Sequence, residues 1–499
     1  MYPFAFFRRR ARLVPDAVAV RHPGGTLTYR TLLERVDALA AAIQSQNPTP
    51  GGRVGILAGN HLEHLLAWLA VLAAGKCWVP LNPRSPAEET GRLIEVTEPQ
   101  LVIADADYRD RVPAGMPLMV ARDGRGSELA AAIDRKLGKM PAGVSLPLDA
   151  PQAIKFTGGS TALPKGVVQP YRAWNTNLLS QLHAIGLQAD DVYVVAAPIT
   201  HGTGTYLLPT LAAGGSILLL ERTRPADLLE AFATGGGTTT FLPPTLIYML
   251  LQEPDAAARS YPSLRHLIYG GAPMRVEAIR KAQAAFGPRI AVTYGQTEAP
   301  QIMAYLDGAA LAEEANIASV GPASLMTEVA VMAPDGTLMP AGEAGEVVAR
   351  GDLLMTGYWR NPEETAKTIR NGWLHTGDVG VLDERGYLFI RDRMKEMIIT
   401  GGFNVVPADV ENALGRHPDV ADCAVFGLPD EKWGEAVTAA VQRRAGSTLT
   451  EADLIAFAKE RLGSVKAPKT IRFLDALPKT PVGKTDKPLL KRQAAGETG

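Results

Sequence analysis

Residues 264–295 read LRHLIYGGAPMRVEAIRKAQAAFGPRIAVTYG and predict a strand–helix–strand unit. Leu264–Tyr269 is predicted as a strand and is followed by the glycine pair Gly270-Gly271. The next segment has the spacing of an amphipathic helix, with apolar residues at Val276, Ile279, Ala282 and Phe286. Ile290–Tyr294 is a second buried strand. Glycines follow both strands at their carboxyl ends, which is the edge where open α/β sheets bind ligands.

Strand and helix signals alternate along most of the 499 residues, which predicts an α/β fold with largely parallel sheets. The chain is too long for one compact core, so more than one domain is expected. The amino-acid composition changes at the charged stretch Arg391–Glu396. After it we expect a helix at Pro407–Leu414, a strand at Ala421–Phe426 and a helix at Glu451–Leu462. The predicted domains are residues 1–393 and residues 394–499.

Composition and charge narrow the class of protein. The formal charge is −1, so no strong field would attract nucleic acid or an anionic membrane. The two cysteines lie far apart in sequence, which fits a reducing compartment better than a disulfide framework. Phe4–Arg10 combines aromatics with arginines like a targeting signal, but no continuous apolar region follows, and we interpret it as a mature N-terminus. The apolar run Leu65–Ala74 is shorter than the roughly 20 residues that span a bilayer. We expect a cytoplasmic protein.

Two segments resemble phosphate-binding loops. The stretch FTGGSTALPKG, Phe156–Gly166, offers bare backbone amides, hydroxyls and one lysine, which suit phosphate oxygens. It is not a P-loop, because Lys165 follows a proline and no helix start follows the lysine. Gly483-Lys484-Thr485 is no P-loop either, since Pro478 stands where that motif has glycine. Each segment alone fits a solvated turn as well as a binding loop.

Five segments in order resemble the adenylate-forming superfamily, which includes acyl-CoA synthetases, luciferases and peptide-synthetase adenylation domains. They are Phe156–Gly166, Tyr294–Glu298, His375–Asp378, Arg391–Gly402 and Pro478–Lys484. Their order and spacing fit from about residue 10 to residue 495, which is nearly the whole chain. The resemblance implies a large N-terminal domain of layered α/β subdomains plus a β-rich subdomain. It also implies a smaller α+β C-terminal domain that acts as a mobile lid, joined by a hinge at Lys395.

The resemblance implies an ATP site that uses Mg²⁺. The adenylate and its phosphates would be held by Thr157, Gly158, Gly159, Ser160, Thr161, Lys165, Gly271, Ala272, Pro273, Tyr294, Gly295, Gln296, Thr297, Glu298, Asp378, Arg393 and Lys484. Tyr294 would stack on adenine, Asp378 and Arg393 would hold the ribose, and Glu298 would bind the cation. Thr157, Glu298 and Lys484 would be the catalytic residues, with Lys484 bridging the attacking carboxylate and the α-phosphate.

The implied reaction has two half-reactions. A carboxylate first joins the α-phosphate of ATP and releases pyrophosphate; coenzyme A then takes the acyl group. Both reactants of the first step are anions, so positioning and charge neutralisation carry the catalysis. For the second step the C-terminal domain would rotate, withdrawing Lys484 and bringing in the loop Thr400–Asn404. Gly401, Gly402 and Phe403 of that loop would line the channel for coenzyme A.

The acyl pocket of the family corresponds here to His201, Gly202, Thr203, Tyr206, Tyr269, Gly270 and Gly295. Peptide-synthetase domains usually have an aspartate where Gly202 stands, so an α-amino acid is not expected. The helix at Thr245–Leu250 offers no arginine, which argues against a dicarboxylate such as malonate. The glycines at positions 202, 204, 270, 271 and 295 are expected to leave room for an aromatic or medium-chain fatty acid. His201 fits a pocket gate and a satisfied core histidine equally well.

Some features depart from the family pattern, and some alternatives stay open. Gly158 replaces a usual serine, Ala162 a usual glycine, and Asp392 a common glycine. A freestanding adenylation enzyme that loads a carrier protein in trans, or a luciferase-type oxygenase, would share these motifs. A non-enzymatic nucleotide-binding protein would be expected to have lost Lys484 or Glu298. The segment Pro478–Lys484 also resembles the recognition pattern of lysine acetyltransferases, with Lys484 as the target.

Overall fold

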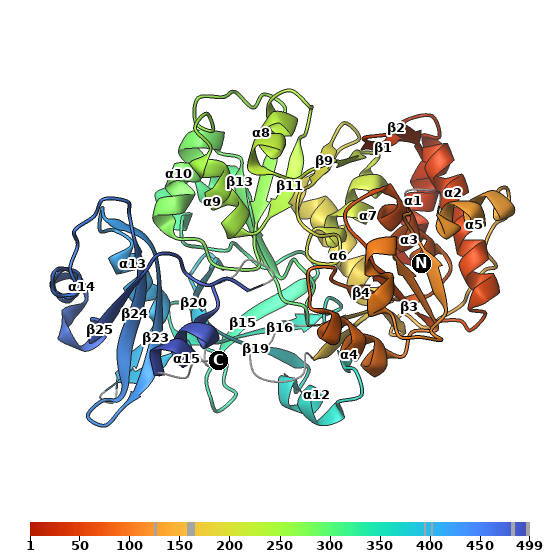
Figure 1. Ribbon diagram of the computed structural model, residues 1–499. Coiled ribbons are helices and arrows are strands. Elements are labelled where there is room, and N and C mark those ends of the chain that lie inside the picture. The colour runs from red at the N-terminus through yellow and green to blue at the C-terminus, as the bar shows by residue number, and fades with distance from the viewer. Residues whose placement is uncertain (124–126, 157–164, 394–395, 401–402, 481–484, 496–499) are drawn as a thin grey trace.

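The computed structural model describes residues 1–123, 127–156, 165–393, 396–400, 403–480 and 485–495 (Figure 1). Its strands form four sheets, and most helices cover the two largest. The helices are α1 (Pro3–Leu13), α2 (Tyr29–Gln46), α3 (Leu62–Ala73), α4 (Ala87–Thr97), α5 (Glu128–Lys136), α6 (Tyr171–Ile185), α7 (Gly204–Ala213), α8 (Pro225–Ala233), α9 (Pro244–Gln252), α10 (Val276–Phe286), α11 (Gly308–Leu311), α12 (Pro362–Thr368), α13 (Pro407–Leu414), α14 (Glu451–Lys466) and α15 (Lys487–Ala495). The α/β class expected from the sequence is confirmed.

The first large sheet is parallel except at its two edges. Its strands run in the order β14 (Ala304–Leu306), β13 (Ile290–Tyr294), β12 (His266–Tyr269), β11 (Thr239–Leu242), β9 (Val192–Val195), β10 (Ser216–Leu219), β1 (Val18–His22) and β2 (Gly25–Thr28). The predicted unit at 264–295 is confirmed as β12, α10 and β13, with β12 starting two residues later than expected. β12 and β13 are parallel neighbours, so their glycine turns lie at one edge of the sheet.

The second large sheet has a parallel centre and an antiparallel end. Its strands run in the order β17 (Gly357–Tyr358), β8 (Gly166–Pro170), β7 (Pro151–Phe156), β4 (Cys77–Leu81), β3 (Arg53–Leu57), β5 (Leu101–Ala104) and β6 (Leu118–Val120). β7 and β8 flank the segment 157–164, so the motif Phe156–Gly166 connects two adjacent antiparallel strands.

The two large sheets share one apolar core. Trp68 on α3, Trp78 on β4 and Trp174 on α6 pack against one another with ring centroids 5.9 to 6.2 Å apart. α3 is buried along nearly its whole length, as its unbroken apolar run predicts. α1 is part of this core as well, because Phe7 is fully buried and Arg8 donates hydrogen bonds to Asp37 on α2. These contacts make α1 part of the folded N-terminal body.

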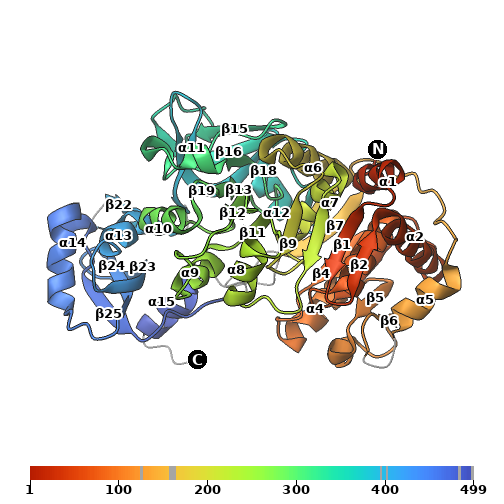
Figure 2. The same cartoon turned by 90° about the horizontal axis from the view of Figure 1, so that it is seen from above.

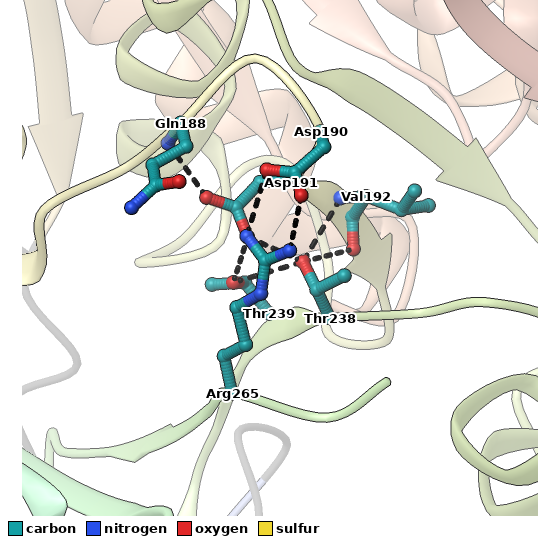
Figure 3. A network of polar contacts seen from close by, with 7 residues as sticks. All are labelled: Gln188, Asp190, Asp191, Val192, Thr238, Thr239 and Arg265. Carbon is teal, nitrogen blue, oxygen red and sulfur yellow. Dashed lines mark hydrogen bonds and ion pairs between the residues drawn. The ribbon is translucent and has the colours of Figure 1, made fainter. Parts of the chain in front are cut away.

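A polar network ties together the amino-terminal ends of three strands of the first sheet (Figure 3). Asp191 precedes β9 and is almost fully buried. Its carboxylate accepts hydrogen bonds from the Thr238 hydroxyl at 2.7 Å and from Arg265 at 3.1 Å, just before β11 and β12. The same carboxylate accepts the backbone amide of Gln188 at 2.7 Å. The network lies at the opposite end of these strands from the glycine turns, so it supports the sheet away from the ligand edge.

Two smaller sheets complete the chain. One is antiparallel and contains β15 (Thr327–Met332), β16 (Ala344–Gly351), β18 (Ile369–Arg370), β19 (Trp373–Leu382) and β20 (Leu388–Arg393). The other contains β21 (Ile398–Thr400), β22 (Phe403–Val405), β23 (Val420–Asp430), β24 (Gly434–Arg443) and β25 (Thr470–Leu474). This last sheet has an apolar core of its own with α13 and α14. The elements β21 to α15 are called the C-terminal domain below.

The C-terminal domain lies at one end of the molecule, beside α9 and α10 (Figures 1 and 2). The expected helix Pro407–Leu414 is confirmed as α13, while β23 is longer than expected. α14 continues past its expected end at Leu462, with a kink at Gly463. The boundary between residues 393 and 394 stays a prediction. None of the helices in the described ranges combines the length and apolar character that crossing a bilayer requires.

Candidate active site

Two of the predicted ATP-site segments meet at Asp378. Tyr294 is the last residue of β13, and its hydroxyl donates a hydrogen bond of 2.7 Å to Oδ2 of Asp378 on β19. The Gln296 amide donates to the same oxygen at 2.8 Å and to the carbonyl of Thr376 at 3.0 Å. Asp378 is 4% exposed. The segments predicted for adenine and ribose, about 80 residues apart in the sequence, therefore form one polar cluster.

The backbone of Arg393 lies beside the same cluster. Asp378 on β19 and Arg393 on β20 are register partners of an antiparallel pair. The backbone amide of Asp378 also donates to the Thr376 hydroxyl at 3.1 Å. The predicted ribose residues thus start from adjacent strand positions, although nothing is described of the Arg393 side chain.

Glu298 is held by contacts with β17 and with the chain just before it. Its carboxylate accepts a hydrogen bond of 2.8 Å from the hydroxyl of Tyr358 on β17. Its carbonyl accepts the backbone amide of Met355 at 2.8 Å. The neighbouring Thr297 carbonyl accepts the side chain of Gln169, on β8, at 2.7 Å. Because β17 pairs with β8, these contacts connect Glu298 to the strand that leaves the loop.

The carboxylate of Glu298 fits a Mg²⁺ ion that is bound together with the phosphates of a nucleotide. Within the described ranges, no three carboxylate, imidazole or thiol groups gather as a metal cluster. Mg²⁺ at nucleotide sites commonly uses one or two carboxylates together with substrate phosphates and water. A single half-buried carboxylate such as Glu298 meets that requirement.

Lys165 belongs to the predicted phosphate loop and is the first residue described after the segment 157–164. Thr157, Gly158, Gly159, Ser160, Thr161 and Ala162 lie outside the described residues. The ammonium group of Lys165 forms an ion pair with Glu364 on α12. The same group lies 5.2 Å from the centroid of the Tyr358 ring. The hydrogen-bonded ion pair with Lys165 holds the pKa of Glu364 below its ordinary value. Tyr358 therefore contacts both Lys165, by its ring, and Glu298, by its hydroxyl.

A cavity of about 300 Å³ opens beside these groups. It is lined by Gln296, Glu298, Glu346, Tyr358, Glu364, Lys367, Thr368, Arg370, His375, Thr376 and Gly377. Tyr358 and the α12 residues were not predicted from the sequence. Their only local signal is a Gly-Tyr pair followed by Asn361-Pro362, which indicates a turn and a helix start but no chemistry.

The residues predicted for the adenine edge follow β12 directly. Gly271 has φ +77°, a backbone conformation that favours glycine, and a side chain there would meet no atom within 4 Å. Ala272 and Pro273 continue the turn toward α10. The turn therefore lies at the carboxyl edge of the sheet, next to the end of β13 and Tyr294.

The predicted acyl-pocket residues cluster around two side chains that the sequence analysis missed, Gln301 and Phe241. The Gln301 amide donates to the Tyr206 hydroxyl at 3.0 Å. The Phe241 ring stacks on Tyr206 with centroids 5.3 Å apart. A Cβ atom on Gly202 would lie 2.7 Å from both Gln301 and Phe241. Neither position carries a signal in the sequence, because each side chain comes from a different strand end or loop.

The expectation that the glycines leave room is wrong at four positions. A Cβ on Gly270 would lie 2.7 Å from the Thr293 carbonyl, and one on Gly295 would lie 2.5 Å from the Gln301 backbone. A Cβ atom on Gly204 would collide with the carbonyl oxygen of Ile199. These glycines and Gly202 permit close packing and do not open space. Gly271 alone among them has an open Cβ position.

Other predicted pocket residues surround this packing. Thr203 is fully buried at the start of α7, and Tyr269 is buried at the end of β12. The ring nitrogen Nδ1 of His201 lies 2.8 Å from the Thr200 hydroxyl. This contact agrees with a satisfied histidine, and a gating role stays a prediction.

The groups predicted for the second half-reaction are described only in part. Phe403 on β22 is 61% exposed, and Gly401, Gly402, Lys395 and Lys484 lie outside the described residues. The Asp392 carboxylate accepts the backbone amide of Ala408 at 3.1 Å, at the start of α13. Asp392, which departs from the glycine common at this position, thus connects β20 to the C-terminal domain.

Comparison with known proteins identifies the family. Residues 7–359 match the AMP-binding enzyme family, and residues 409–484 match the AMP-binding enzyme C-terminal domain. The chain is 37% identical to a feruloyl-CoA synthase of Amycolatopsis over 97% of both chains. It is 33% identical to a medium/long-chain-fatty-acid–CoA ligase of Mycobacterium tuberculosis, over 92% of this chain and 84% of the relative.

MatB from Rhodopseudomonas palustris has been solved with and without ATP, and both forms resemble this chain. ATP-bound MatB from Rhodopseudomonas palustris matches with a TM-score of 0.91, at 30% identity over 99% of both chains. The apo form of MatB matches with a TM-score of 0.80 at the same identity and coverage. The present structure as a whole is therefore closer to the ATP-bound form. From the matched domains, the relatives and the shared fold, this chain belongs to the AMP-binding enzyme family and is of the adenylate-forming acyl-CoA synthetase type.

Proposed function

We propose that the protein is an ATP-dependent carboxylic acid–CoA ligase that works through an acyl-adenylate. A carboxylate oxygen attacks the α-phosphorus of ATP, and the bond to pyrophosphate breaks. The thiol sulfur of coenzyme A then attacks the acyl carbon, and AMP leaves. The observation that carries the proposal is the convergence of Tyr294, Gln296 and Asp378 beside Glu298, in a chain of this family.

The described residues supply the parts that the first half-reaction needs. Asp378 is a buried carboxylate that can accept ribose hydroxyls, and Tyr294 and Gln296 fix its orientation. Glu298 would hold Mg²⁺, which when bound offsets the negative charge of the phosphates. Lys165 would place a cation near the β- and γ-phosphates once it leaves Glu364. Lys484 would neutralise charge where the two anions meet, and Thr157 would donate to a phosphate.

The acid is proposed to be aromatic or a medium-chain fatty acid. The two relatives are named for feruloyl-CoA and for medium- and long-chain fatty acids. In this chain, the stacked rings of Phe241 and Tyr206 offer an apolar wall, and the Gln301 amide lies against it. The described wall contains no charged group that would pair with an α-ammonium or a second carboxylate.

A panel of carboxylic acids tests the proposal, with pyrophosphate release and thioester formation measured with and without coenzyme A. We expect adenylation of ferulate, benzoate or octanoate, and thioester only when coenzyme A is present. Robust ATP–pyrophosphate exchange with an α-amino acid or malonate would contradict the proposed acid class. Adenylation without transfer to coenzyme A would favour the alternative, a carrier protein loaded in trans. Lys484→Ala is the control for adenylation at this site.

Two further features stay predictions: a cytoplasmic location and acetylation of Lys484. Acetylation would remove the ammonium charge that the first half-reaction uses. Mass spectrometry of acetylated protein, combined with the adenylation assay, tests the second. Stoichiometric acetyl-Lys484 with unchanged adenylation would contradict it.

A further inference from the structure

Asp422 is bound by two cationic side chains from opposite sides of the domain interface. It lies on β23 of the C-terminal domain. Its Oδ1 atom forms an ion pair with Arg275, the residue just before α10 in the N-terminal part of the chain. Its Oδ2 atom lies 3.1 Å from Nζ of Lys479, which follows β25. One carboxylate thus joins the N-terminal body, the C-terminal sheet and the chain that leads to Lys484.

The contacts of Lys479 fix both ends of the segment that contains Lys484. Lys479 and Thr485 form an antiparallel bridge, and Nζ of Lys479 lies 3.0 Å from the Thr485 hydroxyl. The backbone amide of Asp486 also donates to the Pro478 carbonyl at 2.9 Å. The described residues on either side of 481–484 are therefore held together, and Asp422 binds them through Lys479.

The N-terminal side of the contact is equally close-packed. Arg275 follows the predicted adenine-edge residue Pro273 by two positions, and 24% of its side chain is exposed. A Cβ atom on Gly415, at the end of α13, would lie 2.9 Å from an Arg275 nitrogen. The interface therefore has a glycine where the guanidinium group reaches the C-terminal domain.

The contact joins the C-terminal domain to the rest of the chain in the structure described here, which as a whole is closer to ATP-bound MatB than to its apo form. A rotation of the domain would separate Asp422 from Arg275 but would leave the contact between Asp422 and Lys479 within the domain intact. We propose that Asp422 is a positioning residue that, through Arg275 and Lys479, holds the C-terminal domain and the residues flanking 481–484 in the orientation for adenylation. This inference rests on the proposed function.

The ion pair between Arg275 and Asp422 should favour the first half-reaction over the second. Rotation would break the charge-assisted hydrogen bond between Arg275 and Asp422, so the pair stabilises the adenylating orientation by the amount that this attraction exceeds the gain from rehydrating the two charges. Removing the pair should lower the rate of the first half-reaction. It should leave unchanged or accelerate the second, because that step requires the contact to break.

Single-turnover rates of both half-reactions test the inference. Asp422→Asn keeps the shape of the side chain and removes its charge, and Arg275→Gln removes the partner. Each should slow adenylation by about tenfold and spare thioester formation from synthetic acyl-AMP and coenzyme A. The double variant should lose little more than either single variant, because residues that act as one pair are not additive.

Arg280→Gln is the matched control. It lies on the same helix, α10, and removes an exposed arginine that pairs with Glu314 at 2.6 Å within the N-terminal part. It should change neither half-reaction. Thermal unfolding of every variant shows whether the domains stay folded.

The outcomes separate this inference from the proposed function. Equal loss in both half-reactions with an unchanged melting temperature, or additive losses in the double variant, would overturn the positioning role. Unchanged adenylation in Asp422→Asn would overturn it as well. If the wild-type protein adenylated no carboxylic acid, the proposed function itself would fail.

Discussion

The hydroxyl of Tyr358 donates a hydrogen bond of 2.8 Å to the carboxylate of Glu298, and the face of the same ring lies 5.2 Å from the Lys165 ammonium group. One tyrosine thus contacts the carboxylate proposed for Mg²⁺ and the lysine proposed for the phosphates. Burial raises the pKa of Tyr358, and the Glu298 charge raises it further, so the phenol stays protonated and remains a donor. The hydroxyl is therefore placed to orient Glu298.

Removing that hydroxyl should weaken cation binding without unfolding the protein. We expect Tyr358→Phe to raise by severalfold the Mg²⁺ concentration needed for half-maximal adenylation, because Glu298 loses its orienting donor. Binding of Mn²⁺ with ATP, followed by electron paramagnetic resonance, should weaken in parallel. Tyr261→Phe is the control, because it removes a buried hydroxyl that donates to the Ala256 carbonyl at 2.7 Å, far from the site. Equal Mg²⁺ dependence in the two variants would contradict this role.

The charge of Glu298 should matter more than its hydrogen bond. Glu298→Gln keeps the shape and removes the charge, and we expect at least roughly a hundredfold loss of adenylation, about 2.7 kcal/mol. The measurement is ATP–pyrophosphate exchange over a Mg²⁺ titration. Glu328→Gln, which removes an exposed carboxylate paired with Arg350, should have no such effect. Near-normal turnover of Glu298→Gln at low Mg²⁺ would show that Glu298 is structural.

Lys484 and Gly402 should separate the two half-reactions. Lys484→Ala should abolish adenylation and largely spare thioester formation from synthetic acyl-AMP, because its charge is needed only where the two anions meet. Gly402→Leu should keep pyrophosphate exchange and lose thioester formation, because a side chain there is expected to obstruct the channel predicted for coenzyme A. Single-turnover rates are required, since domain motion often limits turnover. Equal damage to both half-reactions in both variants would contradict a rotating domain.

His61 should make stability depend on pH. Its Nε2 atom lies 2.9 Å from Asp105 and its Nδ1 atom 3.0 Å from Glu63. Burial lowers the pKa of His61, but the hydrogen bonds to Asp105 and Glu63 outweigh it and raise the pKa from 6.5 to about 8. Because the folded pKa exceeds the unfolded one, the stabilisation is complete below about pH 6.5 and is lost as pH rises through about 8.

The comparison with His61→Gln isolates this contribution. The difference in unfolding free energy between wild type and variant should fall by up to about 2 kcal/mol between pH 6 and pH 9. Urea unfolding at several pH values measures it. A difference that stays constant, or grows, over this range would show that His61 is neutral in the folded protein.

Asp191 should contribute far more to the free energy of unfolding than its neighbour Asp190. Asp191→Asn removes a buried charge that accepts hydrogen bonds from Thr238 and Arg265, and we expect a loss of roughly 1.5 to 3 kcal/mol. Asp190→Asn removes an exposed, solvent-screened carboxylate paired with the same Arg265 and should cost clearly less. Chemical unfolding of both variants tests this, and similar losses would contradict it.

Local structure and the order of the chemical motifs were determined by the sequence alone. α10 and β13 follow the predicted limits because apolar periodicity and glycine stops act over a few residues. The motif at Tyr294 and the motif at Asp378 were each recognisable by themselves. Their meeting at one carboxylate required the tertiary structure, which brings the end of β13 against the middle of β19.

Only the tertiary structure decided which side chains fill and support the site. Gln301 and Phe241 occupy the space beside Gly202, so a glycine that suggested an open pocket instead permits close packing. Tyr358 reaches Glu298 across 60 residues, and Arg275 reaches Asp422 across 147. Such contacts leave no periodic or compositional signal, because they depend on how separate strands and domains pack and not on neighbouring residues along the chain.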